Sequence, residues 1–210
     1  NQHMFVYFLI KERKEIGPKF FMNCKKMQKI AIPPCIKTIN ESSFENCTTL
    51  QYVSIPSTVE TIESNAFYNC TKLVRVIIPS SFLTIDQNAF SNCVNLTQVS
   101  IPSSVTTIGK RAFHNCKSLI RISIPFSVTV IKENCFSECF SLAYVLLPSS
   151  LKTIESCAFE NCKSIRYISI PSSVTSIESS AFNNCSCFED ISSFPPYLTS
   201  IEEKLFVILN

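Results

Sequence analysis

The chain has 210 residues, of which 46% are hydrophobic and 17% are charged, and this composition excludes a disordered protein. Its formal net charge of +3 is small and its basic residues are distributed along the whole chain, which argues against nucleic acid as a partner. Only two glycines occur, which argues against an open α/β enzyme, because the tight turns and phosphate-binding loops of such enzymes need glycine.

Residues 1–15 precede the first repeat and are expected to form an N-terminal cap. Their longest apolar run, "MFVYFLI", has seven residues, far fewer than the roughly 18 to 20 of a membrane span. Positive charge follows this run, whereas in a secretory signal it comes first. We therefore expect no transmembrane segment and no targeting segment here. One interpretation of residues 1–3 is a cloning scar.

From residue 16 a single motif recurs every 23 residues, in eight units that extend to residue 200. Each unit opens with an isoleucine: Ile16, Ile39, Ile62, Ile85, Ile108, Ile131, Ile154 and Ile177. Five positions later stands a phenylalanine: Phe21, Phe44, Phe67, Phe90, Phe113, Phe136, Phe159 and Phe182. Eight positions after the isoleucine stands a cysteine: Cys24, Cys47, Cys70, Cys93, Cys116, Cys139, Cys162 and Cys185. The repetition predicts a solenoid, because each unit is too small to bury its own apolar face and must stack on its neighbours.

Each unit then carries an apolar trio, such as Leu73, Val76 and Ile78, closed by a proline such as Pro79. Val76 and Ile78 alternate with exposed positions, which predicts a strand with one buried face that pairs in parallel with the next coil. Proline ends the strand because it cannot donate to the ladder. The segment "ESNAFYNC", residues 63–70, predicts one or two helical turns or an irregular segment that carries Phe67 inward.

The last ten residues depart from the repeat. The eighth unit gains one residue around "SSFPPYL", so Ile201 lies 24 residues after Ile177. After Leu205 and Phe206 the chain reads "VILN" where an Asn-Cys pair is expected. Residues 201–210 are therefore predicted to be a C-terminal partial repeat or cap.

The pattern I-x3-A-F-x-N-C-x2-L-x2-V-x-I-P resembles the BspA-type leucine-rich repeat family over residues 16–206. The resemblance implies an α/β fold: a right-handed solenoid with a parallel, concave β-sheet and short helical or irregular convex segments. It also implies a non-enzymatic surface protein that adheres to host or matrix proteins or to another cell-surface protein. The chain departs from the family at Glu63, Asp86, Glu155 and Glu178, where glycine usually follows the opening isoleucine.

The eight regularly spaced cysteines are interpreted as buried thiols stacked on their own copies. Equivalent side chains in neighbouring coils point the same way at about the strand spacing, which is too far for a disulfide. They also lack the paired ligand spacing of a zinc site. The asparagine that precedes most of these cysteines is expected to satisfy backbone groups of the turn.

Four further cysteines lie off this column: Cys35, Cys135, Cys157 and Cys187. Cys135 and Cys157 are expected on adjacent coils. Two alternatives therefore remain for them, a disulfide bond and two separate thiols. The two histidines are His3 and His114, and His114 occupies a variable, solvated position, so no Cys–His nucleophile is predicted. We expect no enzyme activity, no metal site and no cofactor.

Binding information in a solenoid lies in the variable columns, because the fixed columns build the core. The position before the first buried strand residue carries Lys29, Tyr52, Arg75, Gln98, Arg121, Tyr144, Tyr167 and Asp190, and all but Asp190 are taken as binding residues. Exposed apolar residues beside this column are Val74, Ile77, Ile120 and Leu146. Tyrosine and arginine are enriched at protein interfaces, so these residues are predicted to bind a protein ligand. The alternative is a solvated sheet whose tyrosines and isoleucines reflect strand propensity.

Two cellular roles remain open. A cell-surface adhesin is the first, and an intracellular scaffold or self-assembling homo-oligomer is the second; a thiol-based redox role is the weakest hypothesis. Asn46, Asn69 and Asn184 form N-x-[ST] sequons inside the repeat, where a glycan would block stacking. The many thiols also suit a reducing compartment. The family resemblance favours the cell surface, and the sequons and thiols leave a cytoplasmic location open as the alternative.

Overall fold

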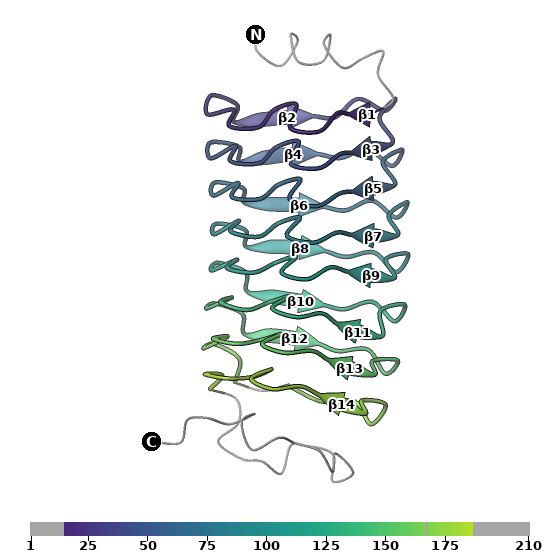
Figure 1. Cartoon of the computed structure of the whole chain (residues 1–210), viewed down its shortest axis with the longest axis vertical. Helices are drawn as coiled ribbons and strands as arrows, with labels where there is room; N and C mark the ends of the chain where they lie inside the picture. The colour runs from purple at the N-terminus through teal and green to yellow at the C-terminus, as the bar shows by residue number, and fades with distance from the viewer. Residues whose placement is uncertain (1–14, 167, 187–210) are drawn as a thin grey trace.

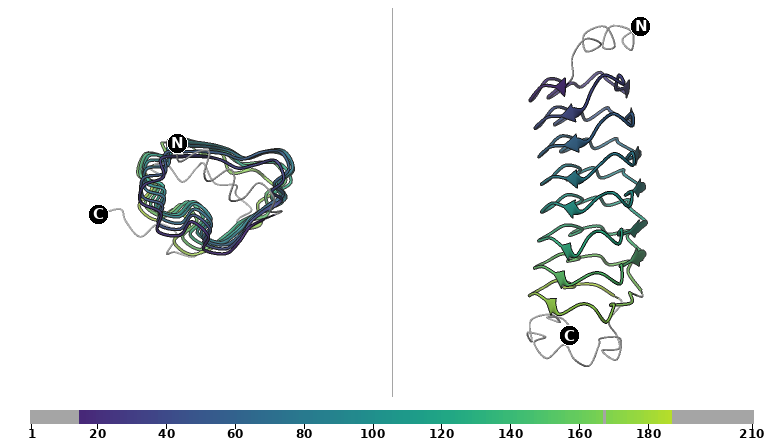
Figure 2. Two further views of the ribbon diagram at one scale, coloured as in Figure 1. Left: turned by 90° about the horizontal axis from the view of Figure 1, so that it is seen from above. Right: turned by 90° about the vertical axis from the view of Figure 1, so that its right-hand side faces the viewer.

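The computed structural model describes residues 15–166 and 168–186, and in this range the chain winds into coils stacked as a column (Figure 1). The view along the column shows successive coils superimposed around one interior (Figure 2). The expected caps lie largely or wholly outside the described residues, since residues 1–14 and 201–210 are not among them.

The predicted strand is present in six coils as a three-residue segment whose middle residue is buried and whose outer residues are exposed. These strands are β2 (Lys29–Ala31), β4 (Tyr52–Ser54), β6 (Arg75–Ile77), β8 (Gln98–Ser100), β10 (Arg121–Ser123) and β12 (Tyr144–Leu146). They form one parallel sheet in the order β12-β10-β8-β6-β4-β2. Each pairs with its equivalent in the next coil, as Arg75 does with Gln98. The predicted parallel, in-register stacking is therefore confirmed for these coils.

A second column of strands runs through the opening isoleucines, which the sequence predicted only to enter the core. These two-residue strands are β1 (Glu15–Ile16), β3 (Thr38–Ile39), β5 (Thr61–Ile62), β7 (Thr84–Ile85), β9 (Thr107–Ile108), β11 (Val130–Ile131), β13 (Thr153–Ile154) and β14 (Ser176–Ile177). They form two parallel sheets, β1-β3-β5-β7-β9 and β11-β13-β14. A two-residue strand is too short to show alternation, which is why the periodicity did not reveal it.

The predicted helical turns are wrong. The described residues contain no helix, so the α/β class is corrected to an all-β parallel solenoid. The reason is visible at Asn65 and Asn69, which both adopt left-handed backbone conformations (φ 58° and 56°) and so interrupt any right-handed helix. The amides of Asn65, Phe67 and Asn69 donate to the next coil, to Gln87, Ala89 and Ser91. The intervening amides of Ala66, Tyr68 and Cys70 donate to the carbonyl three residues earlier.

The repeated apolar residues form the interior of the column, as predicted. The phenylalanine rings of successive coils stack nearly parallel, with Phe67 and Phe90 at 5.3 Å between centroids and 2° between planes. Ile62, Phe67 and Cys70 are each fully buried, and so are their equivalents in the central coils. Because one residue type faces its own copy, each contact in the core is repeated from coil to coil and the packing is uniform along the column.

Candidate binding face

The cysteine column is interior and carries a hydrogen bond that the sequence did not predict. Cys47, Cys70, Cys93, Cys116, Cys139 and Cys162 are fully buried, while Cys24 and Cys185, near the ends of the described range, are half-buried. The Sγ of Cys93 donates to the carbonyl oxygen of Phe67 in the preceding coil at 3.3 Å, and the other coils repeat this bond. The thiol therefore packs as an apolar group and also joins neighbouring coils.

The thiols whose pKa is raised are poorly suited to nucleophilic chemistry, whereas the pKa of Cys47 is lowered, chiefly by its hydrogen bond with Cys70. Burial raises the pKa of Cys93 to about 12. The pKa of the half-buried Cys157 is raised to about 11, and burial is the largest cause of that shift. A thiol in this state is a weak nucleophile near neutral pH because the thiolate is scarce. Cys135 and Cys157 are separate free thiols, so the bridge left open by the sequence does not form. Cys187 and His3 lie outside the described residues.

His114 is half-buried rather than solvated. Its Nδ1 is buried without a hydrogen-bond partner, and burial is the main reason that its pKa is lowered. Within the described ranges no cluster of three or more histidine, cysteine, aspartate or glutamate residues could hold a metal ion. The same part of the chain contains no helix able to cross a membrane.

The asparagine column serves backbone conformation more than the expected capping of turn groups. Asn46, Asn69, Asn92 and Asn115 all have positive φ, a region that asparagine tolerates better than most residues. Their side chains bond to one another: the Nδ2 of Asn69 donates to Asn46 Oδ1 at 2.7 Å, and that of Asn115 to Asn92 Oδ1 at 2.6 Å. The column therefore ties coils together by side-chain amides.

The structure places the predicted binding residues together on one side of the column, which we name the strand face. It comprises the described residues of 25–31, 48–54, 71–77, 94–100, 117–123, 140–146 and 163–169. Lys29, Tyr52, Arg75, Gln98, Arg121 and Tyr144 occupy the first position of successive strands and are exposed. Ile77, Ile120 and Leu146 are also exposed, Val74 is half-buried, and Tyr167 lies outside the described residues.

The strand face is basic, which the sequence analysis missed. Its described residues include nine cations and no aspartate or glutamate: Lys25, Lys26, Lys29, Lys72, Arg75, Lys117, Arg121, Lys163 and Arg166. These residues are distributed along the chain, and only stacking brings them together. The available signal was the spacing, because the cations recur in every second repeat.

Ion pairs within the described part of the chain lie on other sides of the column. They join neighbouring coils as Lys37–Glu60 (3.8 Å), Lys110–Glu133 (2.8 Å) and Lys132–Glu155 (3.6 Å). Three of the nine cations of the strand face instead lie over aromatic rings. Lys29 Nζ lies 5.2 Å from the centre of the Tyr52 ring. The Phe140 ring lies between two lysines: Lys117 Nζ of the preceding coil is 5.5 Å from the ring centre, and Lys163 Nζ of the following coil is 5.6 Å from it. Such contacts hold a cation in place without neutralising it.

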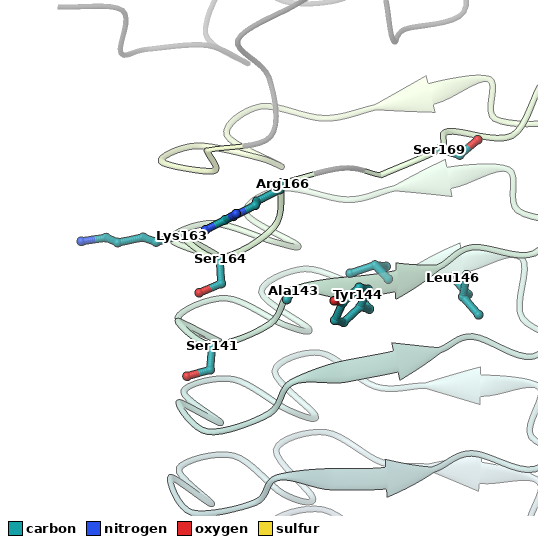
Figure 3. A pocket seen from close by; sticks show the side chains of 9 residues that line it. Ser141, Ala143, Tyr144, Leu146, Lys163, Ser164, Arg166 and Ser169 are labelled. Atoms are coloured by element: carbon teal, nitrogen blue, oxygen red, sulfur yellow. The ribbon is translucent and has the colours of Figure 1, made fainter.

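A hollow of about 640 Å³ lies at the C-terminal end of the strand face (Figure 3). Tyr144 and Leu146 of β12 form its apolar part, and Lys163 and Arg166 from the following coil add two cations. Ser141, Ser164 and Ser169 line the remainder. A concave site with apolar walls and a few polar groups is the usual form of a binding pocket.

Parallel coils of 23 residues with stacked phenylalanines, isoleucines and cysteines define a leucine-rich-repeat type of solenoid. Residues 14–143 and 106–209 match the BspA type leucine rich repeat region, in six copies. The chain therefore belongs to the BspA-type leucine-rich repeat family. The resemblance drawn from the sequence is confirmed.

Two solved bacterial structures are similar over most of the described coils. The leucine rich repeat protein of T. pallidum (TpLRR) has a TM-score of 0.68 and 26% identity, over 84% of this chain and 72% of that one. A leucine rich cell surface protein of Faecalibacterium prausnitzii A2-165 has a TM-score of 0.55 and 25% identity, over 83% of this chain and 63% of that one. A comparison with curated proteins finds no match.

Proposed function

We propose that this chain is a non-enzymatic protein-binding module whose strand face holds a protein ligand, and that it acts in adhesion at a cell surface. The observation that carries this proposal is the exposure of Tyr144, Leu146 and Ile77 (66%, 67% and 57% exposed) beside unpaired cations on one continuous sheet. Exposed apolar and aromatic side chains on one sheet are costly to leave in water, and a partner would cover them.

The surface location is supported by similarity alone. One of the similar solved structures is described as a cell surface protein, and a protein of this family at a surface would find its ligand on another cell or in a matrix. The raised pKa values of the buried thiols make a redox role a poorer explanation of the cysteines.

Binding to a panel of immobilised, purified extracellular-matrix proteins tests the proposal. The test variant replaces Arg75, Arg121 and Tyr144 with alanine. The matched control replaces Lys37, Lys152 and Phe126, which lie outside the strand face, and it removes the same charge and one exposed ring.

We expect at least one matrix protein to bind the unmodified chain, and the test variant to weaken that binding by at least about tenfold. The control should bind as the unmodified chain does, and both variants should keep its melting temperature. Equal loss in the two variants, or no binding to any matrix protein, would contradict the proposal.

A further inference from the structure

The charges of the strand face alternate from coil to coil. The coils of β2, β6 and β10 contribute Lys29, Arg75 and Arg121 at the first strand position, and the coil after β12 contributes Arg166 one position earlier. The strand-face segments between them, residues 48–54, 94–100 and 140–146, contain no charged residue. Cations therefore recur in every second coil, and uncharged coils separate them.

A second cation accompanies each of these. Lys26, Lys72, Lys117 and Lys163 precede the strand position by three or four residues, in the same coils as the first set. Each charged coil thus presents at least two cations, and the coil of β2 presents a third, Lys25. Phe140 in an uncharged coil contacts the lysines of both neighbouring coils. The alternation is a property of the whole strand face rather than of one column.

Sheet geometry sets the distance between the charges. Parallel strands lie about 4.8 Å apart, so cations in every second coil recur at about 9.6 Å, and those from Lys29 to Arg166 span about 29 Å. The register supports this spacing, because Lys29 pairs with Tyr52, Tyr52 with Arg75, Arg75 with Gln98 and Gln98 with Arg121.

Internal ion pairing would have been simple to build on this face and is absent from its described residues. A carboxylate at Tyr52, Gln98 or Tyr144 would lie directly opposite a cation on the adjacent strand and would stabilise the sheet. The chain pairs opposite charges at equivalent positions of neighbouring coils elsewhere, in the turns that contain Lys110 and Glu133. The strand face instead keeps its positive charge available, with tyrosine and glutamine between the cations.

We propose that the strand face binds an acidic polypeptide segment that lies along the column, with carboxylates recurring at about 10 Å to match the cations of alternate coils. This inference rests on the proposed protein-binding function and names the chemistry of the partner. Carboxylates of the segment meet Lys29, Arg75 and Arg121. Its apolar side chains cover Ile77 and Leu146, which a purely charged polymer would leave in water.

A polyproline II peptide provides a probe with this spacing built in. That helix has three residues per turn and rises about 3.1 Å per residue, so a glutamate at every third position recurs at about 9.3 Å. A peptide of about 12 residues, with glutamate at every third position and proline and leucine between, spans the face. The control peptide has the same composition, with its glutamates grouped at one end.

The double variant Arg75→Gln with Gln98→Arg tests the spacing of the charges in the protein. It keeps net charge and composition and moves one charge to the adjacent strand, which breaks the alternation. If spacing determines binding, fluorescence anisotropy should show the spaced peptide binding this variant at least about threefold more weakly than the unmodified chain. The spaced peptide should also bind the unmodified chain at least about fivefold more tightly than the grouped peptide.

Three results would overturn the inference. The first is equal affinity for the two peptides or for the exchanged variant, since bulk charge alone would then explain binding. The second is tighter binding of a heparin oligosaccharide or a single-stranded oligonucleotide than of the spaced peptide. The third is no binding of the peptide at all. If matrix-protein binding still depends on Arg75, Arg121 and Tyr144 in that case, the proposed function stands while the inference about the partner fails.

Discussion

The side-chain amide of Asn115 donates to Asn92 Oδ1 at 2.6 Å, whereas the Oδ1 of Asn115 itself is buried without a hydrogen-bond partner. The next residue of the column is Glu138 rather than asparagine, and a carboxylate cannot donate to that oxygen. Glu138 also has a positive φ of 61°, which asparagine tolerates better.

We therefore expect Glu138→Asn to raise the free energy of unfolding by about 1 kcal/mol, because it supplies the missing donor. Denaturant unfolding measures the change. Glu138→Gly is the control, since glycine relieves the backbone strain without adding a donor. Equal stabilisation by both substitutions would assign the gain to the backbone alone.

Arg111 marks a second position where the sequence fits its backbone poorly. Its φ is 55°, and the equivalent residue two coils earlier is Asn65, at φ 58°. Since a left-handed conformation costs an ordinary residue roughly 1 to 2 kcal/mol, Arg111→Asn should raise the melting temperature by a few degrees. Arg111→Ala keeps the strain and should give no such rise. A higher melting temperature for the alanine variant would contradict this account.

Two glycines that occupy equivalent positions differ in their surroundings. A Cβ added to Gly109 would lie 2.6 Å from the backbone carbonyl carbon of Asp86, whereas one added to Gly17 would meet no atom of the described residues within 4 Å. Gly109→Ala should therefore destabilise the chain by about 1 to 3 kcal/mol, because the backbone of the neighbouring coil must move. Gly17→Ala should be neutral or slightly stabilising. Calorimetry of the two variants tests the difference, and similar losses would refute it.

The buried thiols predict a loss of stability in alkali. Desolvation raises the pKa values of Cys70, Cys93, Cys116, Cys135 and Cys139, so these groups keep their protons in the folded chain. In the unfolded chain a cysteine thiol has a pKa of about 8.5. The folded state then binds more protons, so the unfolding free energy is unaffected below that pH and falls as the pH rises, by about 1.4 kcal/mol per pH unit for each such thiol.

Replacing Cys93 and Cys116 with alanine should make this decline shallower, by the contribution of two thiols. Urea unfolding under reducing conditions between about pH 7 and about pH 10 gives the slope directly. The overall stability of the variant will be lower, so the slopes rather than the absolute values are compared. Parallel pH profiles for the two proteins would contradict the assignment.

The sequence predicted the interior of this protein well, because a column of identical residues has only one way to repeat. Phe67, Cys70 and Val76 are buried where the spacing put them. The helix prediction failed because Ala66 and Phe67 would be buried equally well by a helical turn and by the irregular segment that is observed. Only the left-handed backbone conformations of Asn65 and Asn69 distinguish the irregular segment from a helix.

Side-chain partners were harder to predict than side-chain positions. Spacing placed Cys93 in the core but gave no sign of its bond to the Phe67 carbonyl, because that bond depends on the offset between coils. The binding residues were predicted column by column; the first strand positions, such as Arg75 and Arg121, are exposed, whereas Val74 is half-buried and Tyr167 lies outside the described residues. The alternation of charge was missed because it has twice the period of the repeat, and its binding role stays a prediction.

The pairing of Arg75 with an uncharged neighbour such as Gln98 has a consequence for how such a chain can change length. Duplication of one coil keeps every core contact and every backbone bond, so the lengthened column folds as before. It nevertheless displaces all later cations by a single strand and ends the alternation at that point. Only an insertion of an even number of coils leaves the pattern intact. One coil is therefore the smallest insertion that the fold accepts, whereas two coils are the smallest insertion that keeps the spacing of the surface charges.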